Sequence, residues 1–250
     1  MWLFEQAGID GRAYRTETIR RRLGACLRAL RVGSPAEARL LLQRDRAKVQ
    51  VAVGALVIGV TSFFRDAGVF DHLTYTALAA LPRPPRARRI WSAGCSDGEE
   101  LYSVAILLAE MNLLDDGATL LGTDCRAHAI SHARQGRYVG AQLRDVPQVW
   151  RERYFEPIGA GGYRVLPRLR DAVQWRTADL TRLHEPGAWD LILCRNMAMY
   201  LRPEVAGRLW ERLEQALRPG AFLVLGKAER PVGATRLSLV APCVYRRDRG

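Results

Sequence analysis

The chain has 250 residues and is 48% hydrophobic, which suits one large or two modest folded domains and excludes a disordered chain. Its net charge is +12, and residues 1–89 carry +9 of this excess, with 16 basic against 7 acidic side chains. The expected partner is therefore acidic: a nucleic acid, an anionic membrane or an acidic protein surface.

Residues 1–80 are expected to form a basic, all-helical N-terminal domain. Apolar side chains of residues 18–31 recur at helical spacing on one face. The arginines of this helix that lie largely on its other faces are Arg20, Arg21, Arg22 and Arg28. Ser34 is placed to cap the next helix, and Pro35 suits its first turn.

Two more helices and a linker are expected before the part of the chain in which strands alternate with helices. The longest apolar run, residues 49–60, is too short to span a bilayer and predicts a buried helix. Residues 69–81 predict a further helix, and the Pro- and Arg-rich residues 81–89 predict a linker. Neither a secretory signal nor membrane insertion is expected, because no basic segment followed by an apolar core begins the chain.

After the linker, strands alternate with helices, which predicts an α/β fold with a doubly wound parallel sheet over residues 90–250. Strands are expected at 90–93, 119–123, 173–176, 189–194, 220–226 and 239–246, and helices at 99–111, 127–136 and 203–217. The last strand has no following helix and can pair antiparallel. The glycine-rich residues 159–166 predict a loop or a small hairpin.

A glycine loop follows the first strand, at the edge where open α/β sheets bind nucleotide-like ligands. Gly94 and Gly98 precede the adjacent carboxylates of Glu99 and Glu100, and the loop lacks both the G-x-G-x-x-G pattern and a P-loop lysine. Acidic groups disfavour a phosphate and suit a ligand with a cationic amine and ribose hydroxyls, such as S-adenosylmethionine. The alternative is a simple turn before a helix, whose first residues favour Glu in any case.

Asp124 ends the second expected strand, 25 residues after Glu99. An acid at this place grips ribose hydroxyls in dinucleotide-binding sheets, because a carboxylate offers acceptors to both hydroxyls. The alternative role for Asp124 is to cap the helix at 127–135. The two roles are compatible, and the spacing favours a nucleoside ligand.

A third polar cluster follows the strand at 189–194. Arg195, Asn196 and Tyr200 stand at the same edge of the sheet as the first two motifs, so all three motifs are expected to meet in one crevice. Taken singly, Arg195 and Asn196 are better explained by loop hydrogen bonding, and Tyr200 by packing as a half-buried residue.

Cysteine and histidine form no metal-ligand set. The cysteines are Cys26, Cys95, Cys125, Cys194 and Cys243. They include no C-x-x-C pair, so reduced thiols in a cytoplasmic protein are expected, with no metal. His128 and His132 are four residues apart on one expected helix, and no third ligand accompanies them.

Several longer motifs stand in a characteristic order. They are Thr61-Ser-Phe-Phe-Arg-Asp66, Ala93-Gly-Cys-Ser-x-Gly-Glu-Glu-x-Tyr-Ser103, Ala133-Arg-x-Gly-x-Tyr138, Arg153-Tyr-Phe155, Tyr163-Arg-Val165 and Cys194-Arg-Asn-x-x-x-Tyr200. In this order they resemble the CheR-type chemotaxis-receptor methyltransferases, which use S-adenosylmethionine to esterify glutamate side chains. The resemblance implies a class I S-adenosylmethionine-dependent methyltransferase domain, with a small β-insertion near 156–166, behind a small helical domain.

The resemblance also implies roles for individual residues. The residues expected to bind S-adenosylmethionine, or its product S-adenosylhomocysteine, are Thr61, Arg65, Gly94, Glu100, Asp124, Asp179, Leu180, Arg195 and Asn196. Arg65 and Tyr200 are expected to be catalytic. The arginines at 20, 21, 22 and 28 are expected to hold the substrate, an acidic helical region of a bacterial chemoreceptor or a similar signalling protein, with the enzyme acting as a monomer.

Four positions depart from the family's pattern. The family commonly has Asn at Gly59, Thr at Asp97, Asn at Asp179 and His at Lys227. These departures leave open a catalytically impaired relative that binds S-adenosylmethionine as an interaction module. A methyltransferase acting on RNA is a further alternative. It is disfavoured because the basic N-terminal segment lacks interleaved aromatic side chains for base stacking.

Overall fold

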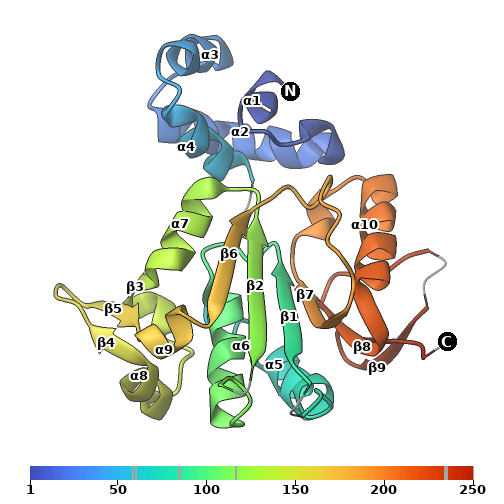
Figure 1. Ribbon diagram of the computed structural model, residues 1–250. Coiled ribbons are helices and arrows are strands. Elements are labelled where there is room, and N and C mark those ends of the chain that lie inside the picture. Colours follow the sequence, from blue (N-terminus) through green and yellow to red (C-terminus); the bar gives the residue numbers. More distant parts are fainter. Residues whose placement is uncertain (58, 60, 84–85, 116, 234–235, 250) are drawn as a thin grey trace.

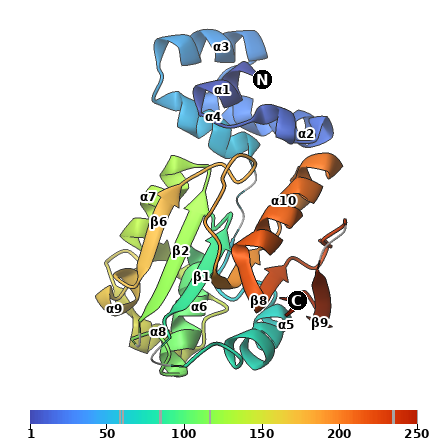
Figure 2. The ribbon, with the colours of Figure 1, turned by 45° about the vertical axis from the view of Figure 1, so that its right-hand side comes forward.

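A seven-stranded, mostly parallel sheet carries a group of helices beyond one of its ends (Figures 1 and 2). The computed structural model describes residues 1–57, 59, 61–83, 86–115, 117–233 and 236–249. No helix in these ranges has the length and apolar character that crossing a bilayer requires.

Four helices form the N-terminal group, namely α1 (Trp2–Gln6), α2 (Thr16–Leu30), α3 (Pro35–Arg44) and α4 (Lys48–Leu56), with a 3₁₀ turn at Gly11–Ala13. Ser34 caps α3 as expected, because its hydroxyl accepts a hydrogen bond from the Glu37 amide at 3.2 Å. The helix expected over 49–60 ends at Leu56, and residues 58 and 60 lie outside the described ranges.

The helix expected over 69–81 is divided into α5 (Ala67–His72) and a π-helical turn (Leu73–Leu78). Their apolar side chains Phe70, Leu73 and Leu78 are buried in the same core as strand residues of the main sheet. The domain boundary expected near residue 80 stays a prediction, since the N-terminal helices also share a core with the sheet. Within the expected linker, residues 84 and 85 lie outside the described ranges, and 88 and 89 already belong to the first strand.

The main sheet has the strand order β6-β2-β1-β7-β8-β10-β9. The strands are β1 (Arg88–Ala93), β2 (Ala118–Asp124), β6 (Val173–Thr177), β7 (Trp189–Cys194), β8 (Leu217–Leu225), β9 (Leu237–Ala241) and β10 (Val244–Arg247). The pairs from β6 to β8 are parallel, whereas β10 runs antiparallel to both of its neighbours. The single strand expected at 239–246 is therefore wrong: a turn with Cys243 at φ 66° divides it into a hairpin.

Alternating side chains build a core on each face of the sheet. Ile90 joins the core formed with α5, α6 (Glu99–Glu110) and α7 (Ala127–Gln135). Its neighbour Trp91 joins the core formed with α10 (Pro203–Ala216) and the N-terminal helices. Both faces of the sheet are thus covered, as the continuous apolar strands predict.

A second, three-stranded sheet of order β3-β5-β4 follows α7. It contains β3 (Arg137–Val139), β4 (Phe155–Pro157) and β5 (Gly162–Val165), and its connections are a 3₁₀ turn (Gly140–Leu143), α8 (Gln148–Tyr154) and, after β5, α9 (Pro167–Arg170). The β4–β5 hairpin occupies the region where a β-insertion is expected. The third strand, β3, was not expected, because three residues are too few to show a periodic pattern.

Candidate active site

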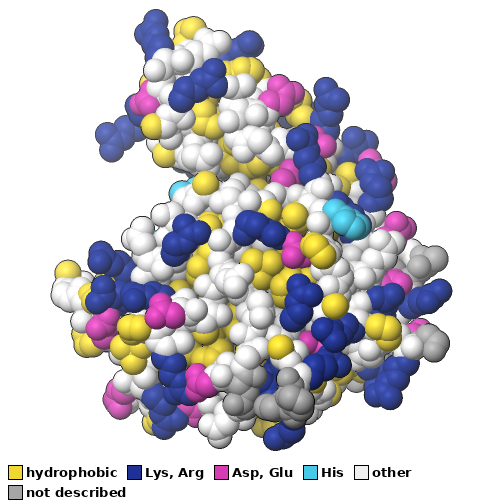
Figure 3. Space-filling view, in the orientation of Figure 1, with side chains coloured by type: hydrophobic (Ala, Val, Ile, Leu, Met, Phe, Trp, Pro, Cys, Tyr) yellow, Lys and Arg dark blue, Asp and Glu magenta, His cyan; other side chains and the backbone are white. Residues whose placement is uncertain are grey.

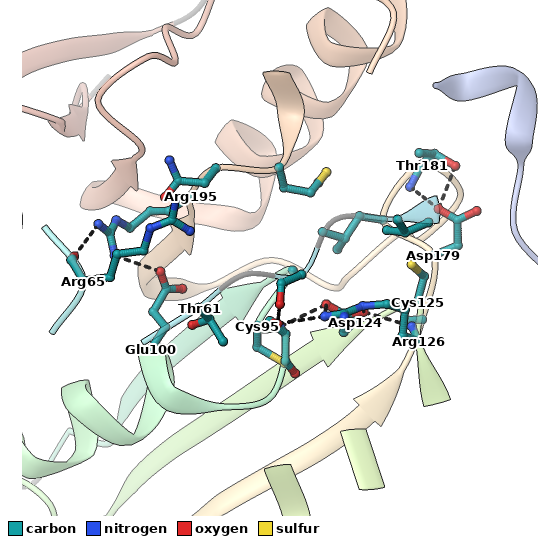
Figure 4. Close-up of a pocket in the computed structure, with 18 of the residues that line it drawn as sticks. Thr61, Arg65, Cys95, Glu100, Asp124, Cys125, Arg126, Asp179, Thr181 and Arg195 are labelled. Atoms are coloured by element: carbon teal, nitrogen blue, oxygen red, sulfur yellow. Dashed lines mark hydrogen bonds and ion pairs between the residues drawn. The ribbon is translucent and has the colours of Figure 1, made fainter. Parts of the chain in front are cut away.

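A cavity opens at the carboxyl ends of β1, β2 and β7, and Figure 4 shows side chains that line it. Every residue that the sequence assigned to the cofactor lines it, together with residues that the sequence did not single out. The lining residues are Tyr14, Val57, Gly59, Thr61, Ser62, Arg65, Gly94, Cys95, Ser96, Glu100, Asp124, Cys125, Arg126, Ala178, Asp179, Leu180, Thr181, Arg195, Asn196 and Met197.

The glycine loop is shaped by its backbone conformation. Gly94 and Gly98 have φ of 86° and 97°, a region that side chains with a Cβ rarely adopt. A Cβ on Gly98 would also lie 2.8 Å from the Cβ of Ala133. The amides of Gly94 and Cys95 both donate to the carbonyl of Thr123, at 2.8 and 2.9 Å, and this fixes the loop to the end of β2.

A buried ion-pair network forms one wall of the cavity. The Arg195 side chain is 2% exposed, with Nη1 3.2 Å from Glu100 Oε2 and Nη2 3.0 Å from Asp66 Oδ2. Its Nη2 also donates to the carbonyl of Arg65 at 2.8 Å, and Ser92 Oγ donates to Glu100 Oε1 at 2.8 Å. The network therefore joins β7, α6 and the segment before α5. The unusual Lys227 extends it, because its Nζ lies 3.2 Å from Asp66 Oδ1.

Asp124 stands at the end of β2 and is buried. Its carboxylate accepts from the amide of Ser96 in the glycine loop and from the amide of Arg126, both at 2.9 Å. Because Arg126 directly precedes α7, Asp124 holds the approach to this helix. Asp124 does not cap α7 itself, because Arg126 is the N-cap residue and this helix has no side-chain cap hydrogen bond. The contact of Asp124 with a ribose stays a prediction.

Asp179 connects the cavity wall to the N-terminal segment. Its Oδ1 accepts from the amide and hydroxyl of Thr181, both at 2.8 Å, and its Oδ2 accepts from the amide of Asp10 at 2.9 Å. Both carboxylate oxygens already have partners, so this side chain holds the cavity wall to the N-terminal segment, and its expected contact with the cofactor stays a prediction. Leu180 beside it is buried and gives the wall an apolar surface.

Replacing Asp179 by Asn should lower the stability of the protein, because it weakens the contact between the cavity wall and the N-terminal segment. The amide oxygen can keep both Thr181 donors, and the new NH₂ group then faces the Asp10 amide, which loses its acceptor. We expect a loss of about 1–2 kcal/mol and a fall in Tm of roughly 3–6 °C. Circular dichroism melting would measure it, with the exposed Asp171→Asn as control; an unchanged Tm would show that the Asp10 contact contributes nothing.

Tyr200 and the arginines of α2 lie outside this cavity. Tyr200 is half-buried against the N-terminal segment, where its carbonyl accepts from the Arg15 amide at 3.0 Å. Of the four arginines on α2, those at 20, 21 and 28 are exposed. Arg22 is half-buried and donates from Nε to the carbonyl of Ala55 at 3.1 Å, so it also holds α2 against α4.

The buried Glu229 fixes the loop that follows β7, and the sequence analysis did not identify this residue. It is 3% exposed and accepts from the amides of Asn196, Met197, Met199 and Gly226 at 2.7–3.2 Å. The loop after β7 is fixed by these bonds, including Asn196 at φ 56°. The available signal was the segment Gly226-Lys-Ala-Glu229, in which only the lysine had been singled out.

The other buried acid of the glycine loop faces away from the cavity. Glu99 Oε1 accepts from Gln142 Nε2 at 2.9 Å, and burial raises the pKa of Glu99 to about 7. Burial likewise raises the pKa of the Cys95 thiol, so it stays protonated near neutral pH. Among the described residues, no group of three or more His, Cys, Asp or Glu side chains is placed to hold a metal.

Comparison with known proteins identifies the family. The sequence profile described as "CheR methyltransferase, SAM binding domain" matches residues 59–242. The chain is 34% identical over 241 residues to Chemotaxis protein methyltransferase 2 of Pseudomonas aeruginosa, covering 94% of this chain and 86% of that protein. It is 30% identical over 190 residues to the Chemotaxis protein methyltransferase of Listeria monocytogenes, covering 76% of this chain and 72% of that protein.

One solved structure to which part of this chain is similar is CalS10, an amino pentose methyltransferase from Micromonospora echinaspora, with S-adenosylmethionine bound. The two share 16% identity and a TM-score of 0.39, over 64% of this chain and 49% of that chain. The sheet has the doubly wound form expected of a class I methyltransferase. By its sequence match over most of its length, this chain belongs to the CheR methyltransferase family.

Proposed function

We propose that this chain transfers a methyl group from S-adenosylmethionine to glutamate side-chain carboxylates of a chemotaxis-type receptor. The observation that carries the proposal is the single cavity that gathers the glycine loop, Asp124 and the Arg195–Glu100 pair at one edge of the sheet. The names of the relatives, chemotaxis protein methyltransferases, supply the receptor class.

The donor set of the cavity fits this cosubstrate. Asp124 places a carboxylate at the end of β2, where the ribose is expected, and the guanidinium groups of Arg65 and Arg195 border the place for an amino-acid carboxylate. Glu100 gives a negative charge for the ammonium group. Leu180 and Met197 provide apolar surface for an adenine ring.

Methyl transfer to a carboxylate requires no general acid–base catalysis from the protein. When bound, S-adenosylmethionine supplies an electrophilic methyl group: a glutamate oxygen forms the new C–O bond, the C–S bond breaks, and a neutral thioether leaves. The attacking carboxylate is already ionised near pH 7, so no general base is required. The residues of the cavity then serve to align the carboxylate behind the methyl group and to exclude water.

Arg65 is our candidate for orienting the incoming carboxylate, because it lies in the cavity wall next to the Arg195 network. The catalytic role expected for Tyr200 stays a prediction. Its position against Arg15 instead favours a role in holding the N-terminal segment to the loop after β7. The monomeric state and the cytoplasmic location expected from the sequence also stay predictions.

Methyl transfer can be tested directly. The protein is incubated with labelled S-adenosylmethionine and an acidic helical receptor fragment, and methanol released by mild base is counted. Carboxyl methyl esters release methanol under these conditions, whereas methylated amines do not. Cofactor binding without transfer would favour the interaction module, and label in RNA would favour the nucleic-acid alternative.

The receptor surface is proposed to be the exposed face of α2. Figure 3 shows basic side chains spread over the N-terminal helices. Changing Arg20, Arg21 and Arg28 to Glu should raise KM for the receptor fragment on the order of tenfold at low salt, because opposite charges speed the encounter. We expect kcat and the Kd of S-adenosylhomocysteine to stay near wild type, since all three side chains lie outside the cavity.

A matched control changes the exposed Arg144, Arg246 and Arg249 to Glu, which alters the net charge equally at other places. This control should leave KM almost unchanged, and the difference between the two triple variants should shrink with added salt. Equal KM values for both triple variants would reject α2 as the receptor surface.

A further inference from the structure

The ribose end of the cavity is occupied by a buried arginine. Arg126 is 4% exposed, and its Nε lies 3.1 Å from Asp124 Oδ1. Its Nη2 donates to Ser96 Oγ at 2.8 Å and lies 3.5 Å from Asp124 Oδ2. Figure 4 shows the side chains of Asp124 and Arg126 together at this end.

Arg126 occupies hydrogen-bond acceptor positions on Asp124 that the ribose hydroxyls of a nucleoside would need. A carboxylate has about four acceptor positions, two on each oxygen. On Asp124, Oδ1 already accepts from the amide and the Nε of Arg126, and Oδ2 accepts from the Ser96 amide and more weakly from Arg126 Nη2. Two ribose hydroxyls therefore cannot both bind Asp124 while the guanidinium stays in place.

The guanidinium has room only because residue 59 is glycine. A Cβ on Gly59 would lie 2.0 Å from Nη1 and 2.2 Å from Cζ of Arg126, far inside contact distance. Gly59 also contacts this group of side chains directly, because its carbonyl accepts a hydrogen bond from Ser96 Oγ at 3.2 Å. Any residue larger than glycine at this position would force the guanidinium away from Asp124.

We propose that Arg126, admitted by Gly59, is a specificity-determining residue that competes with the ribose hydroxyls for Asp124. The inference rests on the proposed function, which supplies the nucleoside. The wild-type protein then binds its nucleoside more weakly than the cavity allows and gains little from the ribose 2′-hydroxyl. Removing the guanidinium frees acceptor positions on Asp124, whose carboxylate keeps its two backbone amide donors and therefore its orientation.

The test compares binding of S-adenosylhomocysteine and its 2′-deoxyribose analogue by calorimetry. For the wild type we expect Kd values for the two ligands within about threefold of each other. In Arg126→Met, which keeps an apolar stem and removes the guanidinium, S-adenosylhomocysteine should bind on the order of tenfold more tightly. The deoxy analogue should gain much less, so that the variant distinguishes the two ligands.

Gly59→Ala provides a second route, because it keeps Arg126 and displaces only its guanidinium. It should tighten S-adenosylhomocysteine binding in the same direction and should add nothing in an Arg126→Met background, as expected for coupled residues. This variant tests the inference even where Arg126→Met does not fold. Arg137→Met, on the exposed surface of β3, is the control and should change neither Kd.

The outcomes distinguish a failure of this inference from a failure of the proposed function. Wild-type binding with unchanged or weaker affinity in both Arg126→Met and Gly59→Ala would overturn this inference and leave the proposed function intact. Absence of S-adenosylhomocysteine binding in the wild type and in every variant would overturn both.

Discussion

Replacing Glu229 by Gln is expected to lower the free energy of unfolding by about 3–5 kcal/mol and to weaken S-adenosylhomocysteine binding. Each carboxylate oxygen accepts from two backbone amides: Oε1 from Met197 and Met199, Oε2 from Asn196 and Gly226. A glutamine can satisfy one pair only, because its NH₂ group would face the other pair donor to donor. The site is buried, so water cannot replace the lost acceptor.

Urea unfolding measures the stability change, and calorimetry measures binding at a temperature where the variant stays folded. Affinity should fall because the loop after β7 carries the lining residues Asn196 and Met197. Glu211→Gln, on the exposed side of α10, is the matched control and should behave like the wild type. A Glu229→Gln protein with normal stability and normal affinity would show that the four amides find other partners.

Replacing Arg195 by Met should be similarly damaging, for an electrostatic reason. The methionine fills much of the same space but leaves Glu100 and Asp66 without their buried cation. Removing one partner of a buried ion pair typically costs about 3–5 kcal/mol, because the remaining charge stays poorly solvated. Binding of S-adenosylhomocysteine should also fall, since the segment carrying Arg65 loses its link to β7.

A double-mutant cycle can identify this cause. In an Arg195→Met background, the further change Glu100→Gln removes the stranded charge and should recover part of the lost stability. In the wild-type background the same Glu100→Gln change should be destabilising, because it weakens a formed ion pair. Destabilisation of equal size in both backgrounds would mean that Arg195 acts through packing alone, for instance through its guanidinium over the Phe70 ring.

Much of the fold could be predicted because its elements are long and periodic. The strand expected at 189–194 is β7 to the residue, since the apolar residues 191–194 are followed by the charged Arg195. Failures occurred where local backbone geometry decides the outcome. The π-helical turn at Leu73–Leu78 and the hairpin turn at Cys243 leave no mark on hydrophobic periodicity.

The site divides in the same way. Residues at strand ends, such as Gly94 and Asp124, could be found because parallel strands bring their carboxyl ends to one edge. Glu229 could not, because its partners are backbone amides, which every residue has. Asp179 was expected to bind S-adenosylmethionine, and its hydrogen bond with the Asp10 amide depends on how two distant segments pack. Gly59 was noticed as a departure, and only the structure connects it with Arg126.

The N-terminal helices share the cavity as well as bearing the proposed receptor surface. Tyr14 contributes to the cavity wall, and the Asp10 amide reaches Asp179 on the rim. A receptor held by α2 and a nucleoside held in the cavity therefore act on one connected unit. By thermodynamic reciprocity, whatever factor receptor binding applies to the Kd of the cosubstrate, the cosubstrate applies to the Kd of the receptor. The affinity for the receptor and the affinity for the cosubstrate are then linked by a single coupling constant.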